Sequence, residues 1–375
     1  MLRIAAMASA LCIVAVWALY PAVIGLIASM RRRFGAPVAD DLASLPRVTA
    51  VLATRADPAS VRDRVDDLLR SEYPADLLDV IVAYDARTTE ASANWEIDER
   101  AARIRVVRGD EPGGKAAALN VGVRVATGDV VVFADSGQRF GSDAISLLVA
   151  ATMRAGVGAA SGRLELSRGA NAPALPLQLY WSLERWLRRR EAEVHSAVGV
   201  TGAIYAMRRS LWTTLPAGLI LDDLYVPMRL VLDGHRIAFV DGARAYETRA
   251  TTDGNEYRRK VRTLTGVLQL CSWLPETLLP LRNPVWPQFV AHKLLRLLTP
   301  YWLLVCVVWF VVAVAQWMGF LWFALATALF VAALQLRSRP FRMLRSALVS
   351  SVLLQAATVR ATANGARKRW DVWHA

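Results

Sequence analysis

The apolar residues of this chain gather in long runs at its two ends and in short runs through its middle. Ile4 to Met30 is apolar apart from a few Ser, Pro and Tyr positions, and Tyr301 to Ala315 and Met318 to Leu336 form two further runs. About 20 apolar residues are needed to cross about 30 Å of hydrocarbon. The pattern therefore predicts an N-terminal transmembrane anchor and a two-helix transmembrane hairpin, about residues 301–336, near the C-terminus.

Two shorter apolar segments flank the predicted hairpin. Residues 289–298, FVAHKLLRLL, mix apolar and basic positions, which indicates an amphipathic helix at the membrane surface. Residues 347–359 are interrupted by serines and a glutamine, so we predict a second interfacial helix there. A cleaved signal peptide is the alternative for the N-terminal run. The apolar core of a signal peptide is about 7–15 residues, which is shorter than this run.

The middle of the chain, residues 45–285, has the pattern of an α/β domain. Apolar runs at 47–54, 77–85 and 129–135 indicate buried strands, and the segments 60–73 and 113–128 between them have helical spacing or glycine boundaries. Near-continuous apolar strands that alternate with helices are typical of a mostly parallel sheet covered on both faces. In such sheets ligands bind beyond the carboxyl ends of the strands.

Three of the predicted strands end at or beside a carboxylate. These acids are Asp57, Asp85 and Asp135. A single acid at such a position is commonly a turn former or a helix cap, but three at one edge favour a shared ligand pocket. The chain continues after Asp135 as Ser-Gly-Gln, so Gly137 occupies the place where a metal–diphosphate site would normally have a second acid.

The charge of the chain strengthens the membrane prediction. The chain has 375 residues, is 55% apolar and carries a formal net charge of +13. Basic residues cluster beside the apolar runs, at 30–34, 336–343 and 365–370, as they do on the cytoplasmic side of membrane proteins. No aromatic–basic recognition module is visible, so we expect no nucleic-acid partner. The three cysteines form no CxxC pair and indicate neither a disulfide framework nor a zinc site.

Local motifs resemble those of the membrane-bound family 2 glycosyltransferases, the class of cellulose and hyaluronan synthases. The GK..ALN element of that family is intact from Gly114 and Lys115 to Asn120 and is the strongest local match. DARTT, beginning at Asp85, corresponds to the family's DGSTD, and residues 53–57 keep only the acid of a motif that otherwise contains Pro and Asn. Asp135-Ser136-Gly137 stands at the DxD position. The resemblance covers nearly the whole chain.

The resemblance implies a GT-A-type fold and an inverting glycosyltransferase that uses a nucleotide sugar of the UDP type. The residues implied to bind the nucleotide sugar are Thr54, Asp57, Asp85, Lys115, Asn120, Asp135 and Arg262. A divalent cation, Mg²⁺ or Mn²⁺, would be held by Asp135 and Gln138. Because magnesium typically needs only one or two carboxylates besides phosphate oxygens, Gly137 need not abolish metal binding.

The same resemblance assigns an acceptor side to the site. Asp222-Asp223 corresponds to the family's downstream acidic pair, so Asp223, with Asp222 as the alternate, would remove the proton from the acceptor hydroxyl. A helix N-cap is the alternative for this pair. Residues 199–209 resemble the segment that lines the acceptor site, which places Thr201 and Gly202 there. Only Arg262 survives from the QxxRW motif of the processive enzymes, which puts chain polymerisation in doubt more than sugar transfer.

The predicted organisation is an anchor at 1–34, a cytoplasmic catalytic domain at 45–285, and interfacial and transmembrane helices at 286–375. The expected location is the bacterial inner membrane. The expected partners are a nucleotide-sugar donor, a lipid-linked or growing polysaccharide acceptor, membrane lipids and polysaccharide-export proteins. An alternative from another class stays open: a catalytically degenerate membrane subunit that binds nucleotide or a partner of an export complex. The departures from the family's motifs motivate this alternative.

Overall fold

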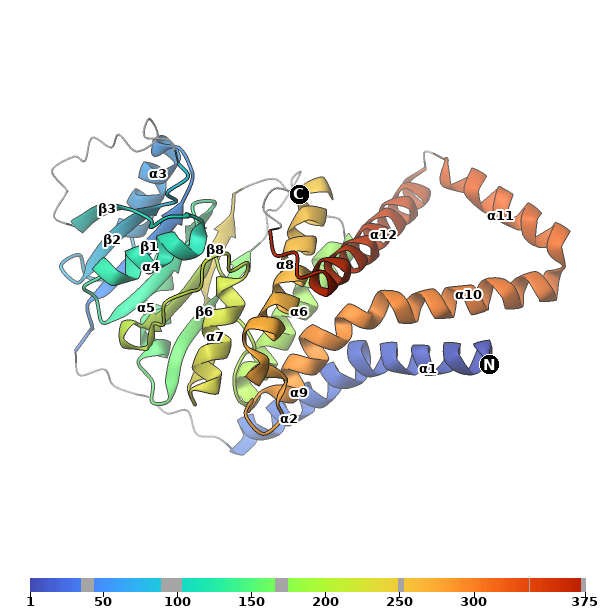
Figure 1. Ribbon diagram of the computed structural model, residues 1–375, viewed down its shortest axis with the longest axis horizontal. Helices are drawn as coiled ribbons and strands as arrows, with labels where there is room; N and C mark the ends of the chain where they lie inside the picture. The colour runs from blue at the N-terminus through green and yellow to red at the C-terminus, as the bar shows by residue number, and fades with distance from the viewer. Residues whose placement is uncertain (35–43, 89–102, 166–174, 249–252, 337, 372–375) are drawn as a thin grey trace.

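A computed structural model describes residues 1–34, 44–88, 103–165, 175–248, 253–336 and 338–371. It contains an α/β domain and a group of long helices that extends from one side of this domain (Figure 1). The residues between the predicted anchor, 1–34, and the predicted catalytic domain, 45–285, fall largely outside the described residues.

The α/β domain is built on one sheet whose described strands follow the order β3-β2-β1-β4-β7-β6-β8-β5. The strands are β1 (Val48–Thr54), β2 (Leu78–Tyr84), β3 (Ile104–Arg108), β4 (Val130–Ala134), β5 (Gln138–Phe140), β6 (Val157–Glu165), β7 (Ile204–Arg208) and β8 (Arg236–Glu247). β1 pairs in parallel with β2 and β4, and β2 pairs in parallel with β3. β7 is antiparallel to β4 and β6, and β5 is antiparallel to β8. The predicted α/β class is confirmed, with a parallel N-terminal half in a mixed sheet.

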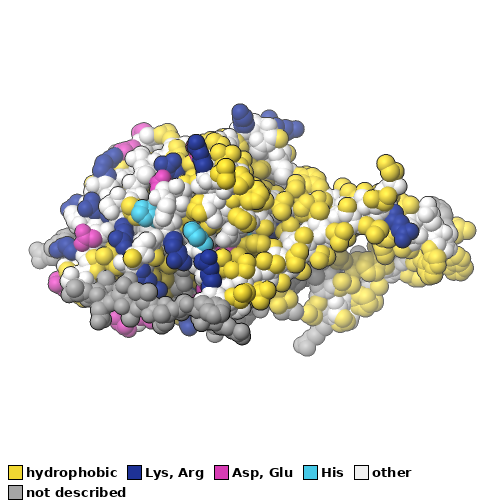
Figure 2. Space-filling model, turned by 90° about the horizontal axis from the view of Figure 1, so that it is seen from below, with side chains coloured by type: hydrophobic (Ala, Val, Ile, Leu, Met, Phe, Trp, Pro, Cys, Tyr) yellow, Lys and Arg dark blue, Asp and Glu magenta, His cyan; other side chains and the backbone are white. Residues whose placement is uncertain are grey.

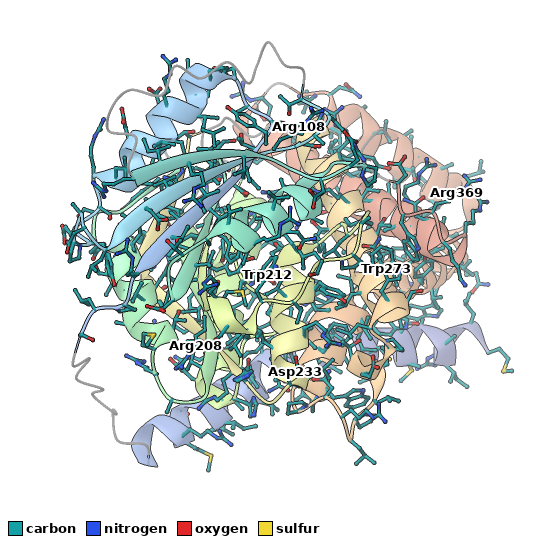
Figure 3. All side chains as sticks on the ribbon, turned by 60° about the vertical axis from the view of Figure 1, so that its left-hand side comes forward. Arg108, Arg208, Trp212, Asp233, Trp273 and Arg369 are labelled. Atoms are coloured by element: carbon teal, nitrogen blue, oxygen red, sulfur yellow. The ribbon has the colours of Figure 1, made fainter. Side chains whose placement is uncertain are left out.

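Helices cover both faces of this sheet. They are α3 (Pro58–Leu69), α4 (Lys115–Val125), α5 (Ala144–Thr152), α6 (Leu175–Val194), α7 (Asp222–Leu232) and α8 (Asp253–Trp273). Successive residues of a strand point to opposite faces: Val51 packs in an apolar cluster with Leu119 of α4, and Leu52 packs in another with Val61 of α3. Trp212, labelled in Figure 3, stacks at 5.4 Å on Phe133 of β4 and extends the first cluster.

The N-terminal helix is continuous through α1 (Leu2–Val14), a π-helical turn (Ala15–Leu19) and α2 (Tyr20–Phe34). α1 lies beside α10 (Thr299–Met318) (Figure 1). In the π-helical turn, the indole of Trp17 donates a hydrogen bond of 3.0 Å to Thr299. α2 packs against α6 of the α/β domain. A Cβ at Gly25 would lie 2.9 Å from the ring of Trp186, so the absence of a side chain lets these helices approach closely.

Within the described ranges, two stretches are long and apolar enough to cross a membrane, Leu2–Arg31 and Trp286–Met318. Hydrophobic side chains gather over the part of the surface that these helices form, while charged side chains lie mostly over the α/β domain (Figure 2). The second stretch includes α9 (Trp286–Phe289), a π-helical turn (Val290–Leu294) and a 3₁₀ turn (Leu295–Leu298). The segment predicted as a separate interfacial helix at 289–298 is therefore continuous with α10.

The last two helices differ from the prediction in length and direction. α11 (Phe320–Leu334) leaves α10 at Gly319 at an open angle and does not lie against it along its length (Figure 1). Its 15 residues span about 22 Å at 1.5 Å per residue. The helix predicted at 347–359 extends through α12 (Arg339–Ala366), because serine and glutamine lower apolarity without ending a helix. α12 returns to the α/β domain, where Asn364 reaches Thr265 of α8.

Candidate functional site

A cavity of about 1010 Å³ opens beyond the carboxyl ends of the parallel strands and continues toward the long helices. All of the predicted site residues line it except Asp57 and Asn120. Those that do are Thr54, Asp85, Lys115, Asp135, Gln138, Thr201, Gly202, Asp222, Asp223 and Arg262. Sequence segments more than 200 positions apart thus meet around one space.

The ammonium group of Lys115 joins the two sides of this cavity. It lies 3.1 Å from Oδ1 of Asp135, which follows β4, and 3.3 Å from Oδ2 of Asp222, which begins α7. Burial alone would lower the pKa of Lys115, but the charges of Asp135 and Asp222 raise it above its usual value. Lys115 is therefore a permanent cation at the start of α4, where the helix dipole also favours a bound anion.

Asp85 fixes the loop that presents Lys115. Its Oδ1 accepts a hydrogen bond of 2.7 Å from the backbone N–H of Gly114, and Arg55 lies 3.7 Å from its Oδ2. Gly113 adopts φ of +83°, and a Cβ there would lie 2.5 Å from Oδ1 of Asp85. A glycine is required at this position both for the backbone conformation and for the close approach of the carboxylate.

Asp222 and Asp223 begin α7 but do not cap it. The N-cap position is Leu221, and no side chain caps the helix, so the N-cap alternative is wrong. Burial, together with the charge of Asp222, raises the pKa of Asp223 to about 6, against the opposing effect of Lys115. A carboxylate that titrates near neutral pH is suited to accept a proton in catalysis.

The space beside Asp223 depends on Gly202. A Cβ at Gly202 would lie 3.1 Å from both Cβ and Oδ2 of Asp223. The backbone N–H of Val200 donates a hydrogen bond of 2.9 Å to the carbonyl of Asp223, which holds the two segments together. The hydroxyl of Thr201 donates to the carbonyl of Gly162 at 2.8 Å, so this side chain anchors the segment.

Two oxygen-bearing side chains near the strand end could contribute to a cation site. The carboxylate of Asp135 is partly exposed to the cavity, and the buried Oε1 of Gln138 has no hydrogen-bond partner within the described part of the chain. Nε2 of Gln138 donates a hydrogen bond of 2.8 Å to Glu247. No cluster of three or more His, Cys, Asp or Glu suited to a metal occurs among the residues described. A divalent cation would therefore need oxygens from a bound ligand as well.

Glu247 was not found from the sequence. It lies at the end of β8, opposite Gln138 in the antiparallel register of β5 and β8, and it lines the cavity. No local motif marks it, because it reaches the site only through strand pairing with Gln138, which is 109 positions away in the chain.

Asp57 and Asn120 are placed outside the cavity, in structural contacts. Asp57 is the N-cap of α3 and accepts hydrogen bonds from the backbone N–H and the hydroxyl of Ser60, at 3.0 and 2.7 Å. The alternative of a helix cap therefore holds for this acid. Asn120 makes reciprocal hydrogen bonds of 2.9 and 2.8 Å with the backbone of Leu215. Thr54 lines the cavity, while its hydroxyl accepts from the backbone N–H of Ala56.

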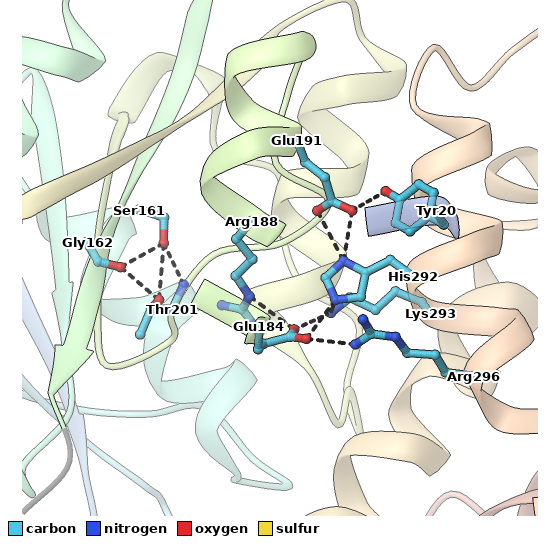
Figure 4. A network of polar contacts seen from close by, with 10 residues as sticks. All are labelled: Tyr20, Ser161, Gly162, Glu184, Arg188, Glu191, Thr201, His292, Lys293 and Arg296. Atoms are coloured by element: carbon cyan, nitrogen blue, oxygen red, sulfur yellow. Dashed lines mark hydrogen bonds and ion pairs between the residues drawn. The ribbon is translucent and has the colours of Figure 1, made fainter. Parts of the chain in front are cut away.

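A buried polar network forms the far end of the cavity (Figure 4). His292 lies between two carboxylates of α6, with Nδ1 2.9 Å from Glu191 and Nε2 2.8 Å from Glu184. Lys293 and Arg296 also contact Glu184, at 3.1 and 2.9 Å. Burial would raise the pKa of Glu184, but the charges of His292 and Lys293 hold it well below its usual value. Each ring nitrogen of His292 therefore faces a carboxylate oxygen of α6.

Comparison with known proteins agrees with this architecture. The model of the family described as "Glycosyltransferase like family 2" matches residues 46–266. The solved structure of mannosyltransferase PcManGT from Pyrobaculum calidifontis, in complex with GDP-Man and Mn²⁺, aligns with 98% of this chain and 100% of its own, with a TM-score of 0.70 and 21% identity. TarS from S. aureus aligns with 59% of this chain and 65% of its own, with a TM-score of 0.40 and 17% identity. Among curated proteins none matches the chain.

Proposed function

The chain belongs to the glycosyltransferase-like family 2, and from this premise we propose that it is an inverting enzyme that transfers a sugar from a nucleotide-sugar donor to a lipid-linked or growing polysaccharide acceptor. One observation carries the proposal. Lys115 lies between Asp135 and Asp222, and Asp223 lines the same cavity. A cation for the leaving group and a base for the acceptor are thereby brought together.

The donor is proposed to lie between the strand ends and the start of α4. Its diphosphate would meet the ammonium group of Lys115 and the N-terminal dipole of α4, both of which favour negative charge. Asp85, Thr54 and Arg262 line the adjoining part of the cavity and are proposed to contact the nucleotide. A UDP sugar is the first candidate. PcManGT was solved with GDP-Man, so GDP sugars belong in the same test.

A divalent cation, Mg²⁺ or Mn²⁺, is proposed to be held by Asp135 and the buried amide oxygen of Gln138. When bound, such an ion would neutralise charge on the diphosphate as the glycosidic bond breaks. The chain's own residues position these two ligands: Lys115 lies 3.1 Å from Oδ1 of Asp135, and Glu247 accepts a hydrogen bond from the NH₂ group of Gln138.

Asp223 is proposed to remove the proton of the acceptor hydroxyl. The hydroxyl oxygen would then bond to the anomeric carbon on the face opposite the diphosphate, which leaves with the bonding electron pair, so that the anomeric configuration inverts. Asp222 is occupied by Lys115 and raises the pKa of its neighbour by like-charge repulsion. Gly202 leaves room for the acceptor beside the Asp223 carboxylate.

The membrane is proposed to supply the acceptor. The cavity reaches Trp17 and Thr299, which belong to the stretches Leu2–Arg31 and Trp286–Met318, each long and apolar enough to cross a membrane. This supports a lipid-linked acceptor over a free polysaccharide. The basic residues at 30–34 and 336–343 favour a bacterial inner-membrane location with the α/β domain in the cytoplasm. Polysaccharide-export proteins are proposed as further partners.

Nucleotide release by the detergent-purified full chain tests the proposal. The chain would be incubated with UDP and GDP sugars, Mg²⁺ or Mn²⁺ and a membrane-lipid extract, and the products measured by mass. We expect Asp223→Asn to lower kcat by about 10²–10⁴-fold, the usual contribution of a general base, with donor affinity retained. Asp233→Asn is the matched control, because Asp233 is exposed at the other end of α7 (Figure 3). Nucleotide binding without turnover of any donor would instead favour the degenerate subunit.

A further inference from the structure

The cavity is longer than the proposed sugar-transfer site requires. From Asp135 and Asp223 it continues past α6 and α8 to side chains on the long helices. These include Trp17 of the N-terminal helix, Thr299 of α10, and Leu354 and Thr358 of α12. The far end therefore has walls from helices with exposed apolar surfaces, which would place it beside lipid.

Arg296 presents unused hydrogen-bond donors at this far end. Its side chain is only 10% exposed, and Nη1 donates a hydrogen bond of 2.9 Å to Glu184. Nε and Nη2 are buried and have no hydrogen-bond partner among the residues that the structure describes. The guanidinium group also lies 4.5 Å from the ring centre of Trp17. Buried donors are almost always satisfied in folded proteins, so this pair indicates a missing ligand.

Trp181 supplies another unused donor in the same cavity. It lies on α6 one turn before Glu184, the residue that holds Arg296, and it lines the same cavity. Its buried Nε1 likewise has no hydrogen-bond partner in the described part of the chain. The guanidinium of Arg259 lies 5.0 Å from the centre of the Trp181 ring, and the ammonium of Lys260 lies 5.4 Å from a ring centre of the same residue. The indole is thus bordered by cations of α8.

The charges around Glu184 leave this end of the cavity positive. Arg188, His292, Lys293 and Arg296 all contact its carboxylate. Arg188, Lys293 and Arg296 carry three positive charges, one more than the carboxylates of Glu184 and the neighbouring Glu191 can balance. Guanidinium and indole groups donate hydrogen bonds but cannot accept them. A ligand that fits must therefore accept several hydrogen bonds and carry negative charge, as a phosphate group does.

We propose that Arg296 and Trp181 form a subsite for the phosphate group of a membrane lipid, whose hydrocarbon chain lies along the apolar surfaces of the long helices. This inference rests on the proposed function, because the lipid would be the anchored end of the acceptor. Glu184 positions the guanidinium of Arg296 through Nη1 and leaves Nε and Nη2 directed to the phosphate.

Lipid binding by the full chain in phosphatidylcholine nanodiscs tests the subsite directly. The probes are a radiolabelled polyprenyl phosphate and the uncharged polyprenol of the same length. We expect the phosphate lipid to bind at least about tenfold more tightly, as a charged hydrogen-bonded group should. Arg296→Gln is expected to remove most of this preference. Trp181→Phe, which keeps a ring and removes the N–H, is expected to reduce it by about two- to fivefold.

Arg282→Gln is the matched control, because Arg282 is exposed just before the same helical stretch and does not line the cavity. Equal binding of the two lipids by the unmodified chain would overturn the proposal, as would an unchanged preference in both variants. Inorganic phosphate that binds as tightly as the phosphate lipid would overturn the lipid assignment. Retained nucleotide-sugar binding in each variant shows that the variant is folded. A lipid preference without any sugar transfer would contradict the proposed function and leave the subsite standing.

Discussion

The ammonium group of Lys115 lies 3.3 Å from Oδ2 of Asp222. Within the described residues, Lys115 forms ion pairs with Asp222 and Asp135 but not with Asp223. Two acids that are adjacent in the sequence therefore have different environments. Asp222 is paired with a cation, whereas Asp223 is buried beside a like charge and has a raised pKa. Different environments for neighbouring acids are a common way to divide roles in an active site.

The rate should depend on the ionisation of Asp223. Because its pKa is raised to about 6 and a base must be unprotonated to act, we expect kcat to rise through about pH 6 and to level off above about pH 7. Asp222→Asn removes a charge that raises this pKa, so the acidic limb should move to lower pH. Profiles of kcat against pH for both proteins measure the shift, and coincident acidic limbs would contradict the assignment.

Gly202→Ala should impair use of the acceptor. The added methyl group would lie 3.1 Å from Oδ2 of Asp223 and displace either that carboxylate or the acceptor hydroxyl. Small displacements of reacting groups can lower a reaction rate by up to about 100-fold. We therefore expect kcat/KM for the acceptor to fall by about 10–100-fold. Donor KM should change little. Gly242→Ala is a matched control: its Cβ would also lie 3.1 Å from an atom, but that atom belongs to the side chain of Leu147, away from the cavity.

The Gln138 amide should tune the metal requirement. A chelator is expected to stop turnover, and added Mn²⁺ to restore it. Gln138→Met keeps a side chain of similar length but removes the buried Oε1, so half-maximal activity should need about tenfold more Mn²⁺, in the range typical of lost coordination partners. Gln269→Met serves as a control, because Gln269 is a buried residue of α8 that hydrogen-bonds the loop before α7 and does not line the cavity. An unchanged Mn²⁺ dependence in Gln138→Met would show that this residue does not bind the metal.

The structural features that depend on contiguous residues were predicted well from the sequence. The apolar strands that end at Asp85 and Asp135 and the glycine-bounded helix at Lys115 are local patterns, and the parallel arrangement brings their ends together. Asp57 shows the limit of such patterns. An acid after a strand can serve a ligand or cap the next helix, and the sequence around it is the same in both cases.

The parts that the sequence did not predict come from long-range contacts. Glu247 enters the cavity through strand pairing, and Glu184 and His292 meet across 108 positions. The course of α11 and α12 was missed for a related reason. Hydropathy reports which residues avoid water but not the direction of a helix after a turn, and the return of α12 to α8 depends on tertiary contacts.

The imidazole of His292 should contribute to stability by separating two buried carboxylates. His292→Leu leaves Glu191 with only the hydroxyl of Tyr20 among its described partners, whereas Glu184 keeps Lys293 and Arg296. Removing one partner of a buried ion pair typically costs about 3–5 kcal/mol, because the remaining charge is uncompensated. We expect a loss of this size in the free energy of unfolding, measured in detergent with a chemical denaturant.

The source of that loss can be tested within the same network. If an uncompensated carboxylate is the cause, the double variant His292→Leu/Glu191→Gln should recover much of the lost stability, because the neutral amide can still accept from Tyr20. If lost packing were the cause, the second substitution would recover nothing. Glu193→Gln on the His292→Leu background is the control, since Glu193 lies on the same helix and forms ion pairs with Arg189 and Arg190. Recovery limited to Glu191→Gln would identify charge, and not shape, as the quantity that His292 balances.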